Sequence, residues 1–343
     1  MQTYELDQIA IEYDVLSNSD KTYDFLKENT LKISIDYQDI IYYFNNKAFR
    51  ELNKTRGYFM SPEWGTASKN FRFRFILIKI DDDYVYVPFK LNTPLYQSKE
   101  SSSFYISGDL ISYNDNQASL DKVLALLKQY ECIKYMSICS DEDTKWDGHN
   151  NYYNTLESFS ENFDKSAWRS KKGINKLSKI VTFESYDYYD DRVYYDIEKL
   201  CSLWCETKYG PNKKSSVKED TGLISIMNKV DTITAFIFRY NDILVGYSIG
   251  VRIADDKILL ESTKNLCVFD DTVLTNYVNE IQEGDLRNLK KHLGPYMQFT
   301  LNKHCLETYK GVYYDGDVGV KHLRDFKREY YKNIIYYKKV DLH

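Results

Sequence analysis

Long apolar runs are missing from this sequence of 343 residues. A helix needs roughly 18–20 consecutive apolar residues to cross a bilayer, whereas the longest apolar strings here, such as Phe75–Ile78, have the length of a strand. The first 14 residues carry four acidic side chains and no basic one, which is unlike a secretory signal. We therefore expect no membrane span and a cytoplasmic location.

Patterns that bind metals or nucleotides are also missing. The six cysteines form no CxxC pair, so we expect reduced thiols. Cys201 and Cys205 lie four residues apart on a predicted helix with no histidine nearby, which favours one buried helix face over half of a zinc site. No GxGxxG or GxxxxGKS/T segment occurs, so a dinucleotide fold and a P-loop are unsupported. The polar segment 141–151 lacks the central glycine and final glutamate of a calcium loop, and it predicts a linker.

Proline is scarce, with 5 residues, whereas tyrosine is abundant, with 33 residues against 17 phenylalanines. Together with frequent Asn, Lys, Asp and Ile, this composition indicates an AT-rich coding genome before it indicates a function. An apolar content of 43% excludes a disordered chain. The length corresponds to two domains of about 150 residues each, or to one large domain.

The net charge of −5 is distributed unevenly between the two halves. Residues 1–150 hold 17 basic and 23 acidic side chains (−6), which leaves 29 basic and 28 acidic (+1) for the remainder. Between Asp164 and Glu184 there is no acidic residue but there are six basic ones. The second half is therefore the better candidate for contact with an anionic partner.

The first half has the pattern of a mixed α/β domain. Residues 71–80 alternate apolar and basic side chains, Asp81–Asp83 form an acidic turn, and 84–89 return as a second strand. The other predicted elements are strands 31–36, 103–111 and 133–139 and helices 39–52 and 117–130. We place a domain boundary at 150, so that residues 1–150 form one half and 151–343 the other.

The second half predicts the order β-α-β-β-β-α-β-α-β, after a leading helix at 156–163 and a basic segment at 167–179. The predicted strands are 180–185, 232–239, 243–252, 257–263, 296–301 and 334–340, and the helices are 194–207, 271–282 and 321–331. Asp270 or Asp271 is a candidate N-cap for the helix at 271–282. Three consecutive strands do not suit a doubly wound sheet, in which strands and helices alternate. We expect an α/β (α+β) fold with a mixed, mostly antiparallel sheet flanked by helices, and two tandem halves of related architecture are a further hypothesis.

This order resembles the acetyltransferase-like fold of acyl-transfer enzymes. The basic segment Trp168–Ile180 resembles the basic helix of Fem-type aminoacyltransferases, and Tyr313–Lys327 resembles the ending of the phosphatidylglycerol lysyltransferase C-terminal domain. The resemblance covers about 160–343, and the first half matches only in general architecture. It implies an acyltransferase of the aminoacyl type.

Coenzyme A is disfavoured as the acyl donor. Its loop should fall at residues 264–272, whose sequence KNLCVFDDT contains no glycine. Such a loop directs backbone N–H groups at a pyrophosphate beside a helix N-terminus, and Asp270 and Asp271 would repel that group. We expect no other cofactor and no metal.

Candidate binding residues follow from the basic segments. Arg169, Lys172, Lys176 and Lys179 have helical spacing, and such a row of cations suits a phosphate backbone as well as a solvated helix face. Arg324 and Lys327 in the helix at 321–331 are further candidates to hold a phosphate, or they cap the final sheet. The partner that these residues favour is aminoacyl-tRNA or another nucleic acid.

Three residues are candidates for catalysis. Asp317 lies in a Gly-rich turn, where its carboxylate would orient an ammonium group or accept a proton, unless the turn serves only as a helix N-cap. Glu261 lies on the strand at 257–263, and His304 is a candidate base. We expect transfer of an aminoacyl group to an amine or hydroxyl acceptor. The alternatives are transfer to modified bases of phage DNA, an acyl-coenzyme A dependent N-acyltransferase, and a non-catalytic nucleic-acid-binding module.

Overall fold

A computed structural model describes residues 73–343 apart from 81, 93–102, 108–109, 113, 130–132, 141–149, 166–167, 211–214, 229, 280 and 315–320. The predicted strand at 31–36, the predicted helix at 39–52 and most of the linker lie outside these residues. The chain divides into two compact units. The first comprises 1–66, 70–149 and 335–343, and the second comprises 67–69 and 150–334.

The first unit is built on a sheet with strand order β1-β2-β3-β5-β12. Its elements are β1 (Phe73–Ile80), β2 (Asp83–Asn92), β3 (Ser103–Ser107), β4 (Ile111–Ser112), α5 (Gln117–Leu127), β5 (Ile133–Ser140) and β12 (Asn333–Asp341). The predicted hairpin is present as β1 and β2, which pair antiparallel from Phe73↔Lys90 to Ile80↔Asp83. After α5 the chain returns as β5, which runs parallel to β3.

The second unit is built on a sheet with strand order β6-β11-β10-β9-β8-β7. Its strands are β6 (Asn151–Asn154), β7 (Val181–Tyr186), β8 (Ile233–Tyr240), β9 (Ile243–Ala254), β10 (Lys257–Asn265) and β11 (Gly311–Tyr314). Strands β7 to β10 form antiparallel pairs, whereas β10 and β11 run parallel. The tight turn between β8 and β9 places Asn241 and Asp242 at positive φ, a conformation that Asn and Asp tolerate better than most residues.

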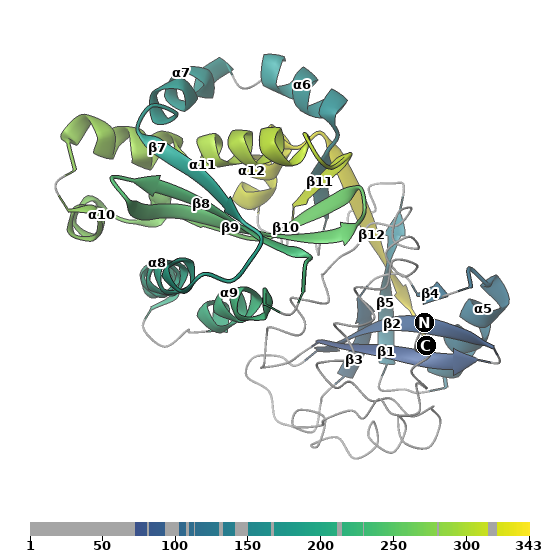
Figure 1. Cartoon of the computed structure of the whole chain (residues 1–343). Helices are drawn as coiled ribbons and strands as arrows, with labels where there is room; N and C mark the ends of the chain where they lie inside the picture. The colour runs from purple at the N-terminus through teal and green to yellow at the C-terminus, as the bar shows by residue number, and fades with distance from the viewer. Residues whose placement is uncertain are drawn as a thin grey trace. The chain divides into compact units, whose positions relative to one another are not determined.

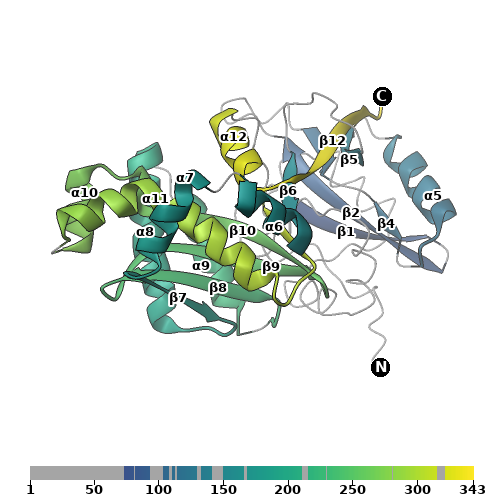
Figure 2. The same cartoon turned by 90° about the horizontal axis from the view of Figure 1, so that it is seen from above.

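Helices cover both faces of this second sheet (Figures 1 and 2). The helices are α6 (Leu156–Lys165), α7 (Trp168–Leu177), α8 (Asp191–Tyr209), α9 (Ser215–Ile226), α10 (Asp271–Val278), α11 (Glu283–Cys305) and α12 (Lys321–Tyr330). α8 and α9 lie on one face, while α11 lies on the other with α7 beside it. The central strands are buried between these layers, since every residue from Ala235 to Tyr240 on β8 is shielded from solvent.

One predicted element is wrong. Residues 296–301, predicted as a strand, lie inside the 23-residue helix α11. Leu289, Leu293, Met297 and Leu301 recur every four residues and are buried, so they form the helix face that packs on the sheet. This helical period outweighs the short aromatic and β-branched run that suggested a strand.

The two sheets share one strand order. In each unit three consecutive strands pair antiparallel (β1-β2-β3 and β8-β9-β10), and the next strand returns through helical structure to run parallel to the third (β5 and β11). An antiparallel strand then follows, which is β12 in the first unit and β6 in the second. This topology agrees with the hypothesis of tandem halves. Within the described residues, no helix is long and apolar enough to span a membrane.

Candidate active site

Strands β10 and β11 form the parallel pair of the second sheet. Their register runs from Lys257↔Gly311 to Leu260↔Tyr314, the last described residue of β11, while β10 continues to Asn265 along β9. A register shift between Leu260 and Ser262 marks a β-bulge at the same point. Bulges redirect side chains and are frequent next to active sites, so we take this point as the candidate active site.

Glu261, a predicted catalytic residue, is the residue of the bulge. It follows Leu260, the last residue of β10 that pairs with a described residue of β11, and it is partly exposed. Glu261 thus carries an ionisable carboxylate at the irregular point of the strand. It can therefore accept a proton or hold an ammonium group.

A buried cation lies at the corresponding end of β11. Lys327 of α12 is only 2% exposed, and its Nζ lies 4.6 Å from the ring centroid of Tyr314, the last described residue of β11. The ring of Tyr152 lies 5.9 Å from the same Nζ. Lys327, predicted to bind phosphate, is thus surrounded by aromatic rings instead of lying on the surface, an environment that strengthens a cation–π contact. Arg324, one turn earlier on α12, is partly buried.

A network of amide side chains fixes the end of α12. Asn154 on β6 donates to Asn302 of α11 (2.9 Å) and to the carbonyl of Tyr330 (2.8 Å), and it accepts from the backbone N–H of Lys332 (3.2 Å). Asn154 and Asn302 are buried. Since each amide is satisfied by partners from a different element, the network holds α12, and with it Lys327, against β6 and α11.

The other two predicted catalytic residues are not brought to this point in the described structure. Asp317 lies outside the described residues. His304 is on α11, and its ring contacts the rings of Phe183 on β7 (5.1 Å) and Phe236 on β8 (5.9 Å). β8 is two strands away from β10, about 10 Å at the usual strand spacing.

A second buried polar cluster, which the sequence analysis missed, joins α9 to β9 and β10. Asp220 of α9 accepts hydrogen bonds from Lys264 and Ser262 of β10 and from Tyr247 of β9, and Lys264 Nζ also donates to Ser262 (2.8 Å). Burial disfavours the charged amine, but the carboxylate of Asp220 outweighs it, and the pKa of Lys264 is raised. The cluster therefore anchors the segment of β10 that directly follows the bulge. The sequence signal for this cluster was the polar run Ser262-Thr263-Lys264 at the end of a strand. Such a run is too weak a signal to identify a partner on α9.

Two backbone N–H groups of the loop after β10 donate within the loop. Asn265 accepts from the N–H of Cys267 (3.0 Å), and the carbonyl of Leu266 accepts from the N–H of Phe269 (3.0 Å). Asp270 is the N-cap of α10, as predicted, and its carboxylate accepts from the N–H of Val273 (2.8 Å). The helix N-terminus that would bind a pyrophosphate is thus occupied by a carboxylate.

The predicted basic helix is present as α7, with Ile174 and Leu177 buried. Lys172 and Lys176 are exposed on its other side, and Lys179 is exposed in the turn that follows. Arg169 lies on α7, and its side chain is outside the described part of the structure. Within the described residues, neither Lys172 nor Lys176 forms an ion pair with a carboxylate.

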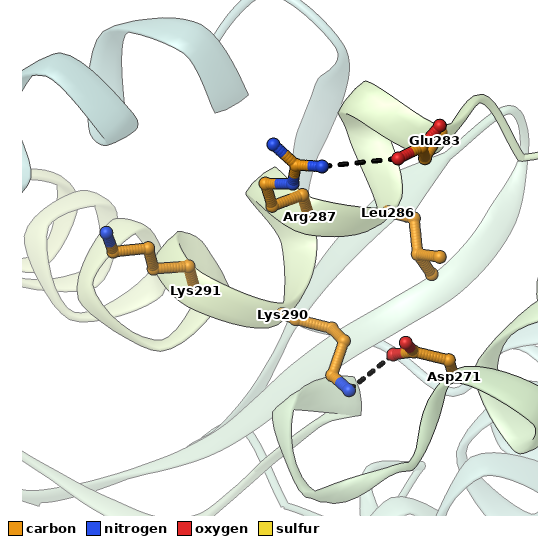
Figure 3. A pocket seen from close by; sticks show the side chains of 6 residues that line it. All are labelled: Asp271, Glu283, Leu286, Arg287, Lys290 and Lys291. Atoms are coloured by element: carbon orange, nitrogen blue, oxygen red, sulfur yellow. Dashed lines mark hydrogen bonds and ion pairs between the residues drawn. The ribbon is translucent and has the colours of Figure 1, made fainter.

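A surface pocket of about 360 Å³ lies between the start of α10 and the first half of α11 (Figure 3). It is lined by Asp271, Glu283, Leu286, Arg287, Lys290 and Lys291. Two of its cations are paired, Lys290 with Asp271 at 2.5 Å and Arg287 with Glu283 at 3.2 Å. Lys291 points away from both pairs (Figure 3).

The two cysteines predicted to form a buried helix face do so. Cys201 and Cys205 are both buried on α8, and neither forms a disulfide. Within the described residues, no group of three or more potential metal ligands occurs.

Comparison with known proteins identifies the fold. No family model and no curated sequence matches the chain. Among solved structures, a conserved protein of unknown function from Bacteroides thetaiotaomicron is similar with a TM-score of 0.58 at 13% identity, covering 92% of this chain and all of that one. FemX is similar with a TM-score of 0.56 at 12% identity, covering 91% of this chain and 97% of FemX. The C-terminal domain assigned to a lysylphosphatidylglycerol synthetase from Agrobacterium fabrum has a TM-score of 0.55 at 7% identity, with 90% and 93% covered.

These similarities confirm the resemblance predicted from the sequence at the level of the fold. The chain shares its fold with FemX and with the lysylphosphatidylglycerol synthetase domain. In this chain the candidate site lies at the parallel β10–β11 pair and the bulge at Glu261.

Proposed function

We propose that the chain is an acyltransferase of the aminoacyl type. Its donor is aminoacyl-tRNA or another activated amino acid, and its acceptor is an amine or a hydroxyl group. The observation that carries this proposal is the loop after β10, where the Asp270 carboxylate occupies the α10 N-terminus and backbone N–H groups are used within the loop. A coenzyme A pyrophosphate would need those same groups. An aminoacyl ester has no pyrophosphate, so it does not need them.

The reaction is a direct displacement at an ester carbonyl. A neutral amine or hydroxyl of the acceptor attacks the carbonyl carbon, a new C–N or C–O bond forms, and the bond to the ribose oxygen breaks. One proton leaves the nucleophile and one is taken up by the ribose oxygen. The residues must therefore hold the two substrates in line, stabilise the oxyanion and provide a route for the proton.

The candidate site offers a group for two of these tasks. The Glu261 carboxylate at the bulge is suited to accept the proton or to orient the amino group of the transferred amino acid. The buried Lys327 ammonium beside Tyr314 is suited to stabilise the negative charge that develops on the carbonyl oxygen, because a preorganised cation in a dry setting acts more strongly than one in water. Arg324 and Asp317 remain further candidates on the segment that follows β11. A donor of this kind places the protein in the cytoplasm.

Competition binding tests the choice of donor. The purified protein is titrated with coenzyme A, uncharged tRNA, duplex DNA and tRNA bearing an amino acid through a stable amide, each over a range of salt concentrations. We expect the charged tRNA analogue to bind more tightly than uncharged tRNA, and coenzyme A to bind poorly. Tight binding of coenzyme A would overturn the assignment of the loop. A preference for duplex DNA would instead favour transfer to DNA bases or a non-catalytic binding module.

A further inference from the structure

Three exposed lysines lie on α7 and α11 near the contact between these helices. The helices meet at Gly173, where an added Cβ would lie 2.2 Å from Cγ of His292, so the backbone of α7 lies directly against that ring. Lys172 and Lys176 flank Gly173 on the exposed side of α7, and Lys291 is the neighbour of His292 on α11. All three are exposed and, within the described residues, none is ion-paired. We call these three residues the crossing surface.

The ring of His292 lies within reach of positive charge from both helices. Burial lowers the pKa of His292, and the positive charges of Lys291 and Lys176 lower it further. The two lysines therefore act on the same ring although they belong to different helices. A protein surface that concentrates unpaired cations in this way attracts polyanions and raises their association rate.

The adjacent pocket differs from the crossing surface. Its cations Lys290 and Arg287 are neutralised by Asp271 and Glu283, so an entering phosphate would have to displace a carboxylate. Lys291 belongs to the pocket wall but points away from both pairs (Figure 3). Within the described residues, the cation of the pocket wall that forms no ion pair is thus Lys291, which directly precedes His292.

We propose that the crossing surface of Lys172, Lys176 and Lys291 binds the backbone phosphates of an RNA, namely the body of the charged tRNA that donates the aminoacyl group. This inference rests on the proposed function for the identity of the RNA. Phosphate contacts position a nucleic acid without reading its sequence. A site that accepts the body common to all tRNAs needs contacts of this kind. The crossing surface would hold the RNA on α7 and α11, while the aminoacyl end reaches the bulge on β10.

The test is RNA binding by charge-reversal variants. Wild type, K172E/K176E, K291E and the triple variant are titrated with uncharged tRNA from 50 to 300 mM salt, so that no turnover is required. We expect the affinity to fall at least tenfold in the triple variant and the slope of log K against log salt to decrease by roughly 1 for each lysine removed. K303E is the matched control, since Lys303 is an exposed lysine about 18 Å along the same helix, and we expect it to bind like wild type.

Two results would overturn the inference. One is that all variants and K303E bind tRNA with the same affinity and salt slope, which would place the RNA elsewhere. The other is that duplex DNA or inorganic pyrophosphate loses affinity in the variants while tRNA does not. A second readout is independent of affinity: bound tRNA should raise the pKa of His292, followed by NMR titration of its ring, and an unchanged pKa would contradict contact. If the variants bind tRNA like wild type and the protein still transfers aminoacyl groups, the crossing surface is wrong but the proposed function stands.

Discussion

At the scale of single residues, burial determines what each charged group can do. Lys264 and Lys172 both belong to the second unit, yet Lys264 is buried in an ion pair with Asp220, whereas Lys172 is exposed. The first can only stabilise the fold locally, because its charge is already satisfied. The second retains a charge that a ligand can use. Sequence spacing identified the exposed lysine but not the buried pair.

The Asp220–Lys264 pair yields a prediction about stability. Lys264→Met leaves the buried carboxylate without its cation, and we expect a loss of about 3–5 kcal/mol in the free energy of unfolding. The double variant D220N/K264M removes both charges and keeps groups that can pair with Tyr247 and Ser262, so it should be markedly more stable than the sum of the two single changes predicts. Urea denaturation of the four proteins measures this coupling. Simple additivity would show that the two side chains do not interact.

The candidate site was only partly predictable from residues. Glu261 was singled out because it is an ionisable group on a strand, but the sequence could not show that it lies at a bulge next to the pair Leu260↔Tyr314. Lys327 was singled out as a phosphate ligand, and its burial among Tyr314 and Tyr152 depends on elements far away in sequence. His304 looked equally suitable, and only the packing of α11 shows that it faces β7 and β8.

At the scale of elements, close packing of α7 on α11 depends on one glycine. Gly173→Ala introduces a methyl group 2.2 Å from Cγ of His292, so the imidazole ring or one of the helices must shift. We expect destabilisation of about 1–3 kcal/mol, typical of an overpacked contact.

Gly284→Ala is the matched control for this prediction. Gly284 also lies in a helix, α11, but no atom lies within 4 Å of its added Cβ, so the change should be neutral or slightly stabilising. Thermal unfolding of both variants makes the comparison. Equal melting temperatures would contradict the close contact between the helices.

Elements with a strong local pattern were predicted well. The hairpin β8–β9, its turn at Asn241 and Asp242, and the N-cap at Asp270 each follow from a few neighbouring residues. β6 and β11 were not predicted, because each has four residues and is stabilised mainly by pairing with distant strands. Helix α9 was missed as well. Its polar side chain at Asp220 faces inwards, which weakens the helical pattern of apolar residues.

At the scale of the whole molecule, the sequence predicted the class of fold but not which unit the last strand joins. The order of strands and helices in the second half led to an acetyltransferase-like architecture, and the similarity to FemX supports that fold. The final strand β12, however, pairs with β5 of the first unit, from Tyr336↔Ser140 to Asp341↔Tyr135. Pairing over nearly 200 residues leaves no local pattern, so no reading of the sequence alone would have found it.

Turnover of charged tRNA tests the central claim most directly. A pool of tRNAs carrying radiolabelled amino acids is incubated with the protein and an extract of the cells that produce it, and label that leaves tRNA for another product is measured. We expect wild type to form a labelled product and E261Q to form it at least tenfold more slowly while still binding tRNA. Consumption of labelled acetyl-coenzyme A, with charged tRNA left untouched, would contradict the account.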